Sequence, residues 1–392
     1  MPNAKHWRTW YDRAMELGKK YRTWIEIDRA AIKKNFTTLR RRIPKKTKFM
    51  AVVKSNAYGH GFVEYAREME RLGADWLGVD SITEALALRR EGLKVPILVL
   101  GYTIPSYYRD AAKYHISLTI SSADSLAHLR RLKLSGEKLR IHLKIDTGMH
   151  RQGFQITERD MVVDALAKLP AAVQIEGLYT HFAEAKNPLI GHTTRKQIAF
   201  FEDWRVLLSE RGYRLLSHAG ATGGAMLYPE AHYDMVRIGI GIYGLWPSEE
   251  ARRTLERVFK LTPVLTWKAI IGEVKRVPFG EKVGYDYTET LQRDTTLAVI
   301  PVGYWHGVPR VLSSKGRVLV RGKSARIVGR VSMDMIVVDV TDIPKVAAGE
   351  EVVLIGASGK LRITPKEIAD LAMTSHYEIV TGLNPLIYKH FR

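Results

Sequence analysis

Short apolar or β-branched runs alternate with helical patterns between residues 49 and 244. Strands that alternate with helices along a chain form parallel sheets built from βα units. A closed (β/α)8 barrel and a doubly wound open sheet both produce this alternation, and periodicity does not separate them. Eight runs have the pattern of strands: Phe49–Lys54, Trp76–Val79, Ile97–Leu100, Ser117–Ile120, Arg140–Asp146, Ile175–His181, Leu215–Ala219 and Met235–Gly241.

Chemically reactive side chains gather at the carboxyl ends of these runs. In a barrel, those ends converge on one mouth, where active sites are built. We therefore expect an α/β fold with a (β/α)8 TIM-type barrel over residues 23–258. The residues concerned are Lys54, Lys144, Asp146, His181, His218 and Arg237.

After Pro247 the pattern changes to longer alternating runs separated by turn residues. This pattern predicts a mostly β C-terminal domain over residues 259–392, with a helix from Pro365 to Met373. The early run Trp24–Asp28 precedes the barrel and is a candidate to join this domain. The expected strands are Val264–Val277, Thr296–Val302, Arg317–Val320, Ser324–Val331, Met335–Val340, Glu351–Ile355 and a last one near Tyr377–Val380.

The composition is that of a soluble globular protein, with 46% hydrophobic and 26% charged residues in a chain of 392. No apolar stretch approaches the ~20 residues that span a bilayer. The amino terminus lacks the apolar core of a secretory signal peptide, so we expect a cytoplasmic protein. The absence of cysteine excludes disulfides, thiolate metal sites and cysteine nucleophiles. No metal site is expected.

The formal net charge is +20, and the basic residues concentrate early, with 15 lysines and arginines against 4 acidic residues in positions 1–48. No nucleic-acid-binding motif accompanies them, so a solvated basic face is favoured over a specific nucleic-acid site. Residues 1–22 have the spacing of one basic amphipathic helix. Packing against the protein itself or a second copy is favoured over contact with a membrane surface.

Lys54 ends a buried apolar run and is followed by Ser55-Asn-Ala-Tyr-Gly-His-Gly61. A lysine at the mouth of a buried strand is placed for chemistry on a carbonyl group, such as a Schiff base with pyridoxal phosphate. The alternative is a lysine that only terminates a strand.

Two glycine-rich loops follow the seventh and eighth runs, where barrels often bind phosphate. They read His218-Ala-Gly-Ala-Thr-Gly-Gly224 and Arg237-Ile-Gly-Ile-Gly-Ile-Tyr-Gly244. Thr222 would add a hydroxyl donor; the alternative is that the glycines only make tight turns. Arg237 can donate hydrogen bonds but cannot give up a proton, so it suits a pyridine nitrogen that must stay unprotonated. Its alternative role is an ordinary ion pair.

The string from Lys54 to Gly61 closely resembles the Lys-Ala-Asn-Ala-Tyr-Gly-His-Gly signature of the alanine racemase family. Further motifs of that family recur in order from about Trp24 to Tyr388. The resemblance implies a barrel followed by a β domain, with pyridoxal 5'-phosphate carried by Lys54 and its phosphate bound by the hydroxyl of Tyr58.

The resemblance also implies the other cofactor contacts. Thr222 and the segment Gly239-Ile240 match positions that hold the phosphate. Arg237 matches the arginine at the ring nitrogen, and His218 matches the residue that steadies this arginine. His181 matches a histidine that hydrogen-bonds the catalytic tyrosine.

Racemisation removes a proton from one face of Cα and returns one to the other, so two acid–base groups must flank the substrate. Lys54 can serve one face. Gly280-Glu-Lys-Val-Gly-Tyr285 resembles the family segment whose tyrosine is the second base, supplied by the partner subunit of a homodimer. By pattern alone, Tyr287 is an equally good candidate, and the choice of Tyr285 depends on the resemblance.

Substrate contacts follow from two more matches. Arg151, within His142-Leu-Lys-Ile-Asp-Thr-Gly-Met-His-Arg-Gln-Gly153, corresponds to an arginine near the substrate carboxylate. The residue matching Lys144 is carbamylated in many racemases. Met333, within Gly329-Arg-Val-Ser-Met-Asp-Met335, corresponds to a methionine whose backbone N–H contacts the carboxylate across the dimer interface.

Several positions depart from the family pattern. His150 and Gln152 flank Arg151 and alter the polarity of the pocket. Trp305-His306 replaces a common Ala-Asp pair, and Gly382-Leu-Asn-Pro385 replaces a segment that usually holds a tyrosine. These departures leave open the size limit on the substrate side chain.

The expected function is therefore a racemase that interconverts L- and D-alanine and supplies D-alanine for peptidoglycan. The alternatives are racemisation of another amino acid such as serine or lysine, a decarboxylase, or a non-catalytic cofactor-binding protein. Decarboxylases of this barrel class usually use a cysteine, which this chain lacks.

Overall fold

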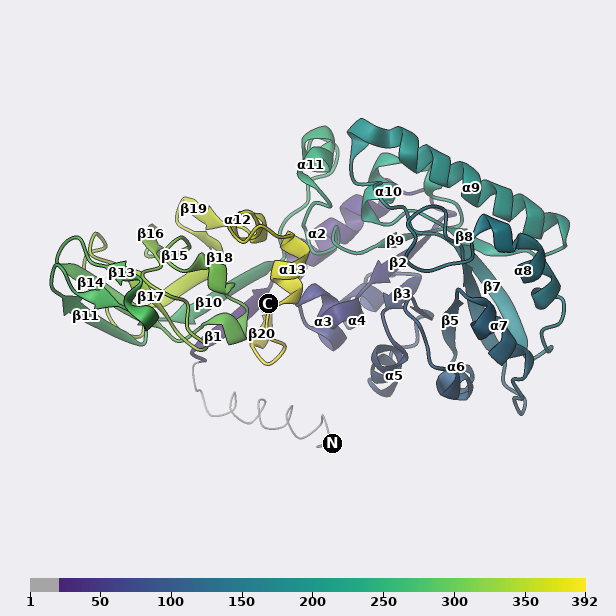
Figure 1. The fold of residues 1–392 in the computed structure, drawn as a ribbon, viewed down its shortest axis with the longest axis horizontal. Coiled ribbons are helices and arrows are strands. Elements are labelled where there is room, and N and C mark those ends of the chain that lie inside the picture. Colours follow the sequence, from purple (N-terminus) through teal and green to yellow (C-terminus); the bar gives the residue numbers. More distant parts are fainter. Residues whose placement is uncertain (1–20) are drawn as a thin grey trace. The chain divides into compact units, whose positions relative to one another are not determined.

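The computed structural model describes residues 21–392, so the helix predicted over residues 1–22 lies almost wholly outside the described part of the chain. The chain divides into two compact units (Figure 1). One unit comprises residues 28–264, and the other joins residues 21–27 to residues 265–392. Each unit is described by itself. Within residues 21–392, no helix is long and apolar enough to cross a bilayer.

The unit of residues 28–264 is a parallel eight-stranded barrel, which confirms the predicted fold class. Its strands pair in the order β8-β7-β6-β5-β4-β3-β2-β9. The ring closes between β8 and β9, where Asp234 N–H donates to the Ser217 carbonyl at 3.0 Å and a parallel bridge joins Ala221 to Arg237. The strands are β2 (Lys48–Val52), β3 (Trp76–Val79), β4 (Ile97–Val99), β5 (Ile116–Ile120), β6 (Leu139–Lys144), β7 (Val173–Tyr179), β8 (Leu216–His218) and β9 (Met235–Ile238).

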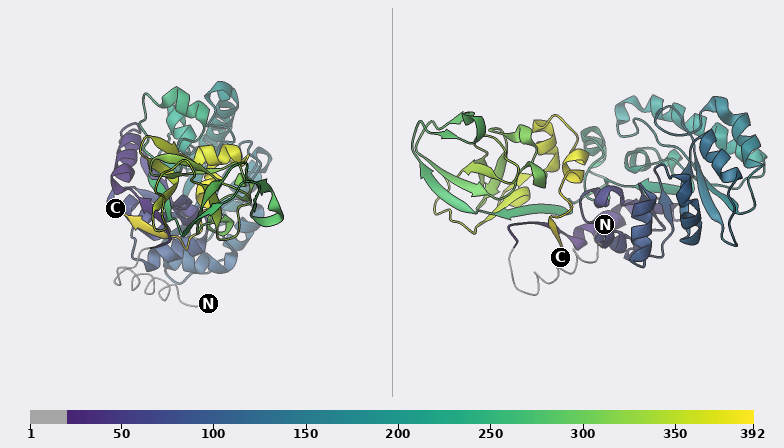
Figure 2. Two further views of the ribbon diagram at one scale, coloured as in Figure 1. Left: turned by 90° about the vertical axis from the view of Figure 1, so that its left-hand side faces the viewer. Right: turned by 60° about the horizontal axis from the view of Figure 1, so that its bottom comes forward.

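Helices surround this barrel on its outside (Figures 1 and 2). Serine or aspartate caps begin several of them, because their side-chain oxygens accept from otherwise unpaired N–H groups. Asp28 caps α2, Ser81 caps α5 and Ser122 caps α7. The helices are α2 (Arg29–Arg40), α3 (Lys54–Tyr58), α4 (Phe62–Arg71), α5 (Ile82–Arg90), α6 (Tyr108–Lys113), α7 (Ala123–Arg130), α8 (Arg159–Leu166), α9 (Gly191–Glu210), α10 (Thr222–Leu227) and α11 (Glu249–Leu255).

The barrel strands are buried on both faces, which explains why they appear in the sequence as nearly continuous apolar runs. Strand β3 is buried at every position. Met50, Trp76, Leu98 and Met235 form one cluster in the barrel core. The barrel interior is therefore a packed core, and chemistry is confined to the strand ends and to the few polar side chains among them.

The second unit is mostly β. Its larger sheet has the order β16-β15-β18-β10-β1-β20, with β19 paired to β18, and its smaller sheet has the order β11-β14-β17. Strand β1 (Thr23–Ile27) lies between antiparallel β10 and parallel β20. The other elements are β10 (Leu265–Ile270), β11 (Glu273–Val277), β12 (Lys282–Val283), β13 (Glu289–Thr290), β14 (Thr295–Ile300), β15 (Arg317–Val320), β16 (Lys323–Arg326), β17 (Ile336–Asp339), β18 (Glu351–Ser358), β19 (Leu361–Ile363), α12 (Pro365–Leu371), α13 (His376–Thr381) and β20 (Tyr388–Phe391).

The last predicted strand, near Tyr377–Val380, is wrong. This segment is helix α13, which begins where the Ser375 hydroxyl accepts from the N–H of Tyr377 at 3.3 Å. Its β-branched residues favour a strand, but the cap and the burial of one helical face at Ile379 and Val380 outweigh that preference. The terminal strand is β20 instead, and the single predicted strand Val264–Val277 is divided into β10 and β11.

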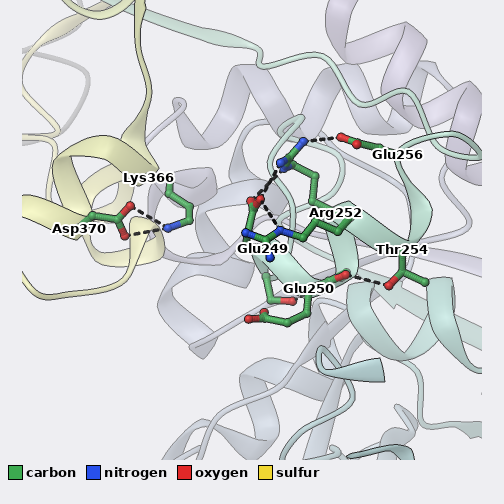
Figure 3. Close-up of polar contacts among 10 residues, drawn as sticks. Glu249, Glu250, Arg252, Thr254, Glu256, Lys366 and Asp370 are labelled. Atoms are coloured by element: carbon green, nitrogen blue, oxygen red, sulfur yellow. Dashed lines mark hydrogen bonds and ion pairs between the residues drawn. The ribbon is translucent and has the colours of Figure 1, made fainter. Parts of the chain in front are cut away.

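Two helices carry exposed ion pairs at helical spacing, drawn in Figure 3. In α11, Arg252 lies between Glu249 and Glu256 and pairs with both. In α12, Lys366 pairs with Asp370 at 2.7 Å. Pairs of this kind are open to solvent, so they stabilise the local helix only weakly.

Candidate active site

Lys54 stands at the carboxyl end of β2, where it begins α3. Its Nζ lies 2.9 Å from Oδ1 of Asp80, which follows β3, and about a third of the lysine side chain is exposed. The carboxylate therefore holds the ammonium group at the barrel mouth while leaving it accessible. Asp80 was not among the predicted residues, although the rule that strand ends meet at the mouth also applies to it.

The backbone after Lys54 makes a left-handed turn. Ser55, Asn56 and Ala57 have φ and ψ values near +50°, and Tyr58 has φ of 53°. Left-handed conformation costs roughly 1–2 kcal/mol for each residue with a Cβ atom. Four such residues in succession are sustained only because the surrounding contacts fix them.

Glu84 supplies part of that fixation. One of its carboxylate oxygens accepts from the N–H of Ser55 at 2.8 Å, and the other accepts from the N–H of Asp80 at 2.7 Å. A single carboxylate thus ties the loop after β2 to the loop after β3. Because Lys54 and Asp80 lie on these two loops, Glu84 sets the distance between them.

The two glycine-rich loops lie together, and the Tyr58 hydroxyl lies beside them. Thr222 Oγ1 accepts from the N–H of Gly239 at 3.0 Å. A methyl group at Gly239 would lie 2.7 Å from the Tyr58 hydroxyl oxygen, so only glycine permits this approach. Burial, together with the charge of Asp80, raises the pKa of Tyr58 to about 12, so its hydroxyl stays protonated and can donate. Ile240 is buried beside Gly239.

Arg237 is buried inside the barrel, with 3% of its surface exposed. Its Nη2 donates to the carbonyls of Thr180 and Ala219 at 2.7 and 2.9 Å. Its Nη1 lies 2.9 Å from His218 Nδ1, and Nη2 lies 3.3 Å from His181 Nδ1. Burial lowers the pKa of Arg237 to about 10, so the guanidinium remains charged at neutral pH.

Lys144 is buried and His181 is partly buried, and both lie near other cations, so their protonation equilibria are unusual. Burial, then Arg237, Arg151, Lys144 and Lys54, lower the pKa of His181 to about 3. Burial, then Arg151, Arg237 and Lys54, lower the pKa of Lys144 to about 8. His181 is therefore neutral at pH 7, and a substantial part of Lys144 is an uncharged amine near pH 8.

Gln152, one of the departures from the family pattern, accepts a hydrogen bond from Lys144 Nζ at 2.9 Å. Arg151 beside it is exposed at the mouth. The turn that presents both residues is held by Asp146, whose Oδ1 accepts from the N–H groups of Gly148, Met149 and His150 at 2.9–3.0 Å.

Tyr285 and Met333 belong to the other unit, and their places at the substrate remain predictions. Both are exposed, at 68% and 52%. Within that unit their loops lie together, because Arg330 and Asp286 form an ion pair with an N–O distance of 3.0 Å. The loops that carry Tyr285 and Met333 therefore lie on one surface of this unit, and neither side chain is covered by its own unit.

Sequence reasoning missed two polar residues on a path that leads away from Arg237: His142, which is fully buried, and Glu176, which is about a fifth exposed. His142 Nδ1 lies 2.9 Å from His218 Nε2, and His142 Nε2 lies 3.2 Å from a carboxylate oxygen of Glu176. The signal for His142 was a polar residue two positions before Lys144 on the same strand. No sequence signal identified Glu176.

The histidine contacts require a glycine at position 177. A methyl group there would lie 2.3 Å from His142 Nδ1. We expect Gly177→Ala to lower the free energy of unfolding by about 1–3 kcal/mol, the usual cost of overpacking a core. Calorimetry would measure the loss, with Gly272→Ala as the matched control, because its nearest atom would lie at an ordinary 3.6 Å. Equal stability of both variants and the unchanged protein would contradict this prediction.

The chain matches two family models along almost its whole length. Residues 27–247 match the alanine racemase N-terminal domain, and residues 264–391 match the alanine racemase C-terminal domain. The alanine racemase of Symbiobacterium thermophilum is 42% identical over 372 residues, which cover 94% of this chain and 97% of the relative. The enzyme named alanine racemase 2 of Bacillus subtilis is 36% identical over 373 residues, covering 94% of each chain.

Solved structures agree with these sequence matches. The alanine racemase of Bacillus anthracis with bound L-Ala-P has a TM-score of 0.88 at 34% identity, over 93% of this chain and 94% of that one. The alanine racemase of Bartonella henselae with covalently bound pyridoxal phosphate has a TM-score of 0.84 at 28% identity, over 95% of this chain and all of that one. With both of its domains matched, this chain belongs to the alanine racemase family.

Proposed function

We propose that this protein is a pyridoxal-phosphate-dependent alanine racemase that interconverts L- and D-alanine. The observation that carries the proposal is the three-point arrangement at the barrel mouth. A lysine follows β2, and a buried guanidinium stands on β9. A glycine cradle lined by hydroxyl groups is formed by the loops after β8 and β9. Each point has the chemistry that one part of pyridoxal phosphate requires.

The donor set fits that cofactor. Lys54 would hold the carbonyl carbon, and Tyr58, Thr222 and the backbone at Gly239-Ile240 would hold the phosphate. Arg237 would face the ring nitrogen, and the absence of a side chain at Gly239 lets the Tyr58 hydroxyl lie close to the backbone segment that would hold the phosphate. The Bartonella henselae relative carries covalently bound pyridoxal phosphate, which supports the same assignment here.

When bound, pyridoxal phosphate withdraws electrons from the substrate Cα and so acidifies its proton. Lys54 Nζ serves one face of Cα and the Tyr285 hydroxyl serves the other. In each turnover, one of them takes the proton and the other returns a proton on the opposite face. Arg237 donates a hydrogen bond without giving up a proton, which limits electron withdrawal and disfavours side reactions such as transamination.

Substrate positioning is assigned to Arg151 and to the backbone N–H of Met333. The fork of an arginine donates two parallel hydrogen bonds to a carboxylate. Neutral His181, beside Arg237, would accept from or donate to the catalytic tyrosine. The exposure of Tyr285 and Met333 supports a homodimer in which each copy completes the other's site. We place the enzyme in the cytoplasm, where it would supply D-alanine for peptidoglycan.

The direct test is to incubate the purified protein with pyridoxal phosphate and L-alanine and to follow D-alanine by chiral chromatography. Formation of D-alanine at a rate that depends on added cofactor supports the proposal. Racemisation of serine or lysine but not of alanine would replace the substrate and retain the chemistry. Release of carbon dioxide, or cofactor binding without turnover, would overturn the proposal in favour of a decarboxylase or a binding protein.

Carbamylation of Lys144 is a separate proposal. A carbamate forms from the uncharged amine, and the pKa of Lys144 is lowered to about 8 by burial and by Arg151, Arg237 and Lys54. The uncharged fraction therefore rises as pH increases through 8. With carbon-13-labelled bicarbonate, we expect a carbamate NMR signal that grows between pH 7 and 9 and is absent in Lys144→Ala. A protein without this signal would show that Gln152 holds the unmodified amine instead.

A further inference from the structure

Arg237 presents an electrostatic problem. Its hydrogen-bond partners among residues 21–392 are two backbone carbonyls and two imidazoles, none of them a carboxylate, and its guanidinium carbon lies 5.1 Å from the centre of the Tyr179 ring. A buried charge is costly unless it is paired and hydrogen-bonded. The barrel must therefore supply a counter-charge by some other route.

A continuous chain of hydrogen bonds leads from Arg237 to a carboxylate. Arg237 Nη1 contacts His218 Nδ1 at 2.9 Å, and His218 Nε2 contacts His142 Nδ1 at 2.9 Å. His142 Nε2 contacts Glu176 Oε2 at 3.2 Å, and the Ser117 hydroxyl donates to the same oxygen at 2.6 Å. Both histidines are fully buried, so no water competes along the route.

The donor and the acceptor of each hydrogen bond between Arg237 and Glu176 follow from the chemistry of Arg237. A guanidinium can only donate, so His218 Nδ1 must accept from it. The proton of neutral His218 is then on Nε2, which donates to His142 Nδ1. The proton of His142 is consequently on its own Nε2, which donates to Glu176. Burial lowers the pKa of both histidines, which keeps them neutral as this scheme requires.

The sheet is modified locally to build this chain. The pairing of β6 with β7 shifts between Ile141 and His142: Ile141 opposes Ile175, but His142 opposes Gly177. Glu176 is the extra residue, and a bulge of this kind re-aims a side chain. Gly177 leaves the space that the His142 ring occupies. The rings are also held by Tyr179, which stacks on His218 with centroids 4.7 Å apart.

The Glu176 end of this hydrogen-bond chain reaches solvent. Glu176 is about a fifth exposed and lines a pocket of about 540 Å3 together with Lys48 and Asp234, which stand at the amino ends of β2 and β9. Burial alone would raise the pKa of Glu176, but the hydrogen bonds from His142 and Ser117 reverse this effect and leave it lowered. The carboxylate is thus charged and partly hydrated.

We infer that His142 and Glu176 are positioning residues, which supply, through two neutral imidazoles, the counter-charge of Arg237. The inference rests on the proposed function for the role of Arg237 at the ring nitrogen. Polarised hydrogen bonds in a low-dielectric interior strengthen one another, so the Glu176 carboxylate acts on Arg237 although it does not touch it.

Nitrogen-15 NMR of histidine-labelled, full-length protein tests the chain without any turnover. The unchanged protein should show His142 and His218 as neutral imidazoles, each with its proton on Nε2. In Glu176→Leu the His142 Nε2 proton loses its acceptor, so its proton resonance should move upfield, while Arg237 still holds the His218 proton on Nε2. The dissociation constant for pyridoxal phosphate should rise about tenfold or more, as is usual when an outer partner is lost.

Two further variants separate the effect of losing the hydrogen-bond acceptor at position 176 from the effect of losing its charge. Glu176→Gln keeps a hydrogen-bond acceptor but removes the charge. It should retain the tautomers of His142 and His218, while its dissociation constant for pyridoxal phosphate rises by less than in Glu176→Leu. Glu202→Leu is the control. It removes a carboxylate that pairs with Arg205 in the same unit but takes no part in the hydrogen-bond chain from Arg237 to Glu176, so the histidine NMR signals and the cofactor affinity should both stay unchanged.

The inference is overturned if His218 carries its proton on Nδ1 in the unchanged protein. It is also overturned if Glu176→Leu leaves the His142 Nε2 proton resonance and the cofactor affinity as they were. If Glu176→Leu does not fold, an unaltered cofactor affinity in Glu176→Gln would show that the Glu176 carboxylate is not the counter-charge of Arg237. Because the histidine measurement needs no turnover, its result stands even if the protein fails to racemise alanine.

Discussion

Lys54→Ala should reduce racemisation of alanine by on the order of 10^4-fold or more, because one side chain both holds the cofactor and moves the proton on one face. The ammonium group lies 2.9 Å from Asp80 at the barrel mouth and is accessible there. No other lysine is held at the end of β2. The rate is measured as D-alanine formed from L-alanine with saturating pyridoxal phosphate.

The matched control is Lys48→Ala, at the opposite end of the same strand. It should keep nearly full activity, because its side chain faces the amino-terminal side of the barrel. Borohydride reduction followed by peptide mapping should also place the cofactor on Lys54 in the unchanged protein. A cofactor found on another lysine, or an active Lys54→Ala protein, would remove Lys54 from the mechanism.

Tyr285→Phe should reduce racemisation by about 10^2–10^4-fold, the contribution expected of one acid–base group. It should not abolish all proton chemistry. Lys54 would still exchange the Cα proton of one enantiomer with solvent, so in heavy water that enantiomer should gain deuterium without inversion. Mass spectrometry combined with chiral separation measures exchange and inversion separately.

Tyr287→Phe is the matched control, since Tyr287 lies two residues away and is equally exposed at 67%. It should retain activity. Mixing the inactive Lys54→Ala and Tyr285→Phe proteins should restore activity if the two bases come from different copies, because a mixed dimer contains one complete site. A larger loss in Tyr287→Phe than in Tyr285→Phe would reverse the assignment.

Much of the barrel could be predicted because its strands are buried on both faces. Trp76–Val79, for example, is an uninterrupted apolar run in the sequence and a fully buried strand in the structure. The site residues of this unit could also be predicted, because strand ends carry Lys54, His218 and Arg237 to one mouth. Local pattern and topology agree at these positions, so each supports the other.

Other features depend on contacts that a local pattern does not contain. Residues 376–381 have strand propensity but form a helix because a serine cap and a buried face favour it. Glu176 was missed because strand residues normally alternate between faces, and an extra residue in β7 interrupts that alternation. A bulge is set by the pairing of two strands, and one strand's sequence does not encode it.

The left-handed turn after Lys54 also constrains how this protein can be stabilised by engineering. Ser55, Asn56, Ala57 and Tyr58 store strain that the rest of the fold offsets. Glycine at Ser55 or Ala57 would relieve strain and yet loosen the lysine, because glycine admits many more backbone conformations. A search that selects only for heat resistance would therefore accept changes here that sacrifice turnover, so a thermostable variant should be sought elsewhere in the chain.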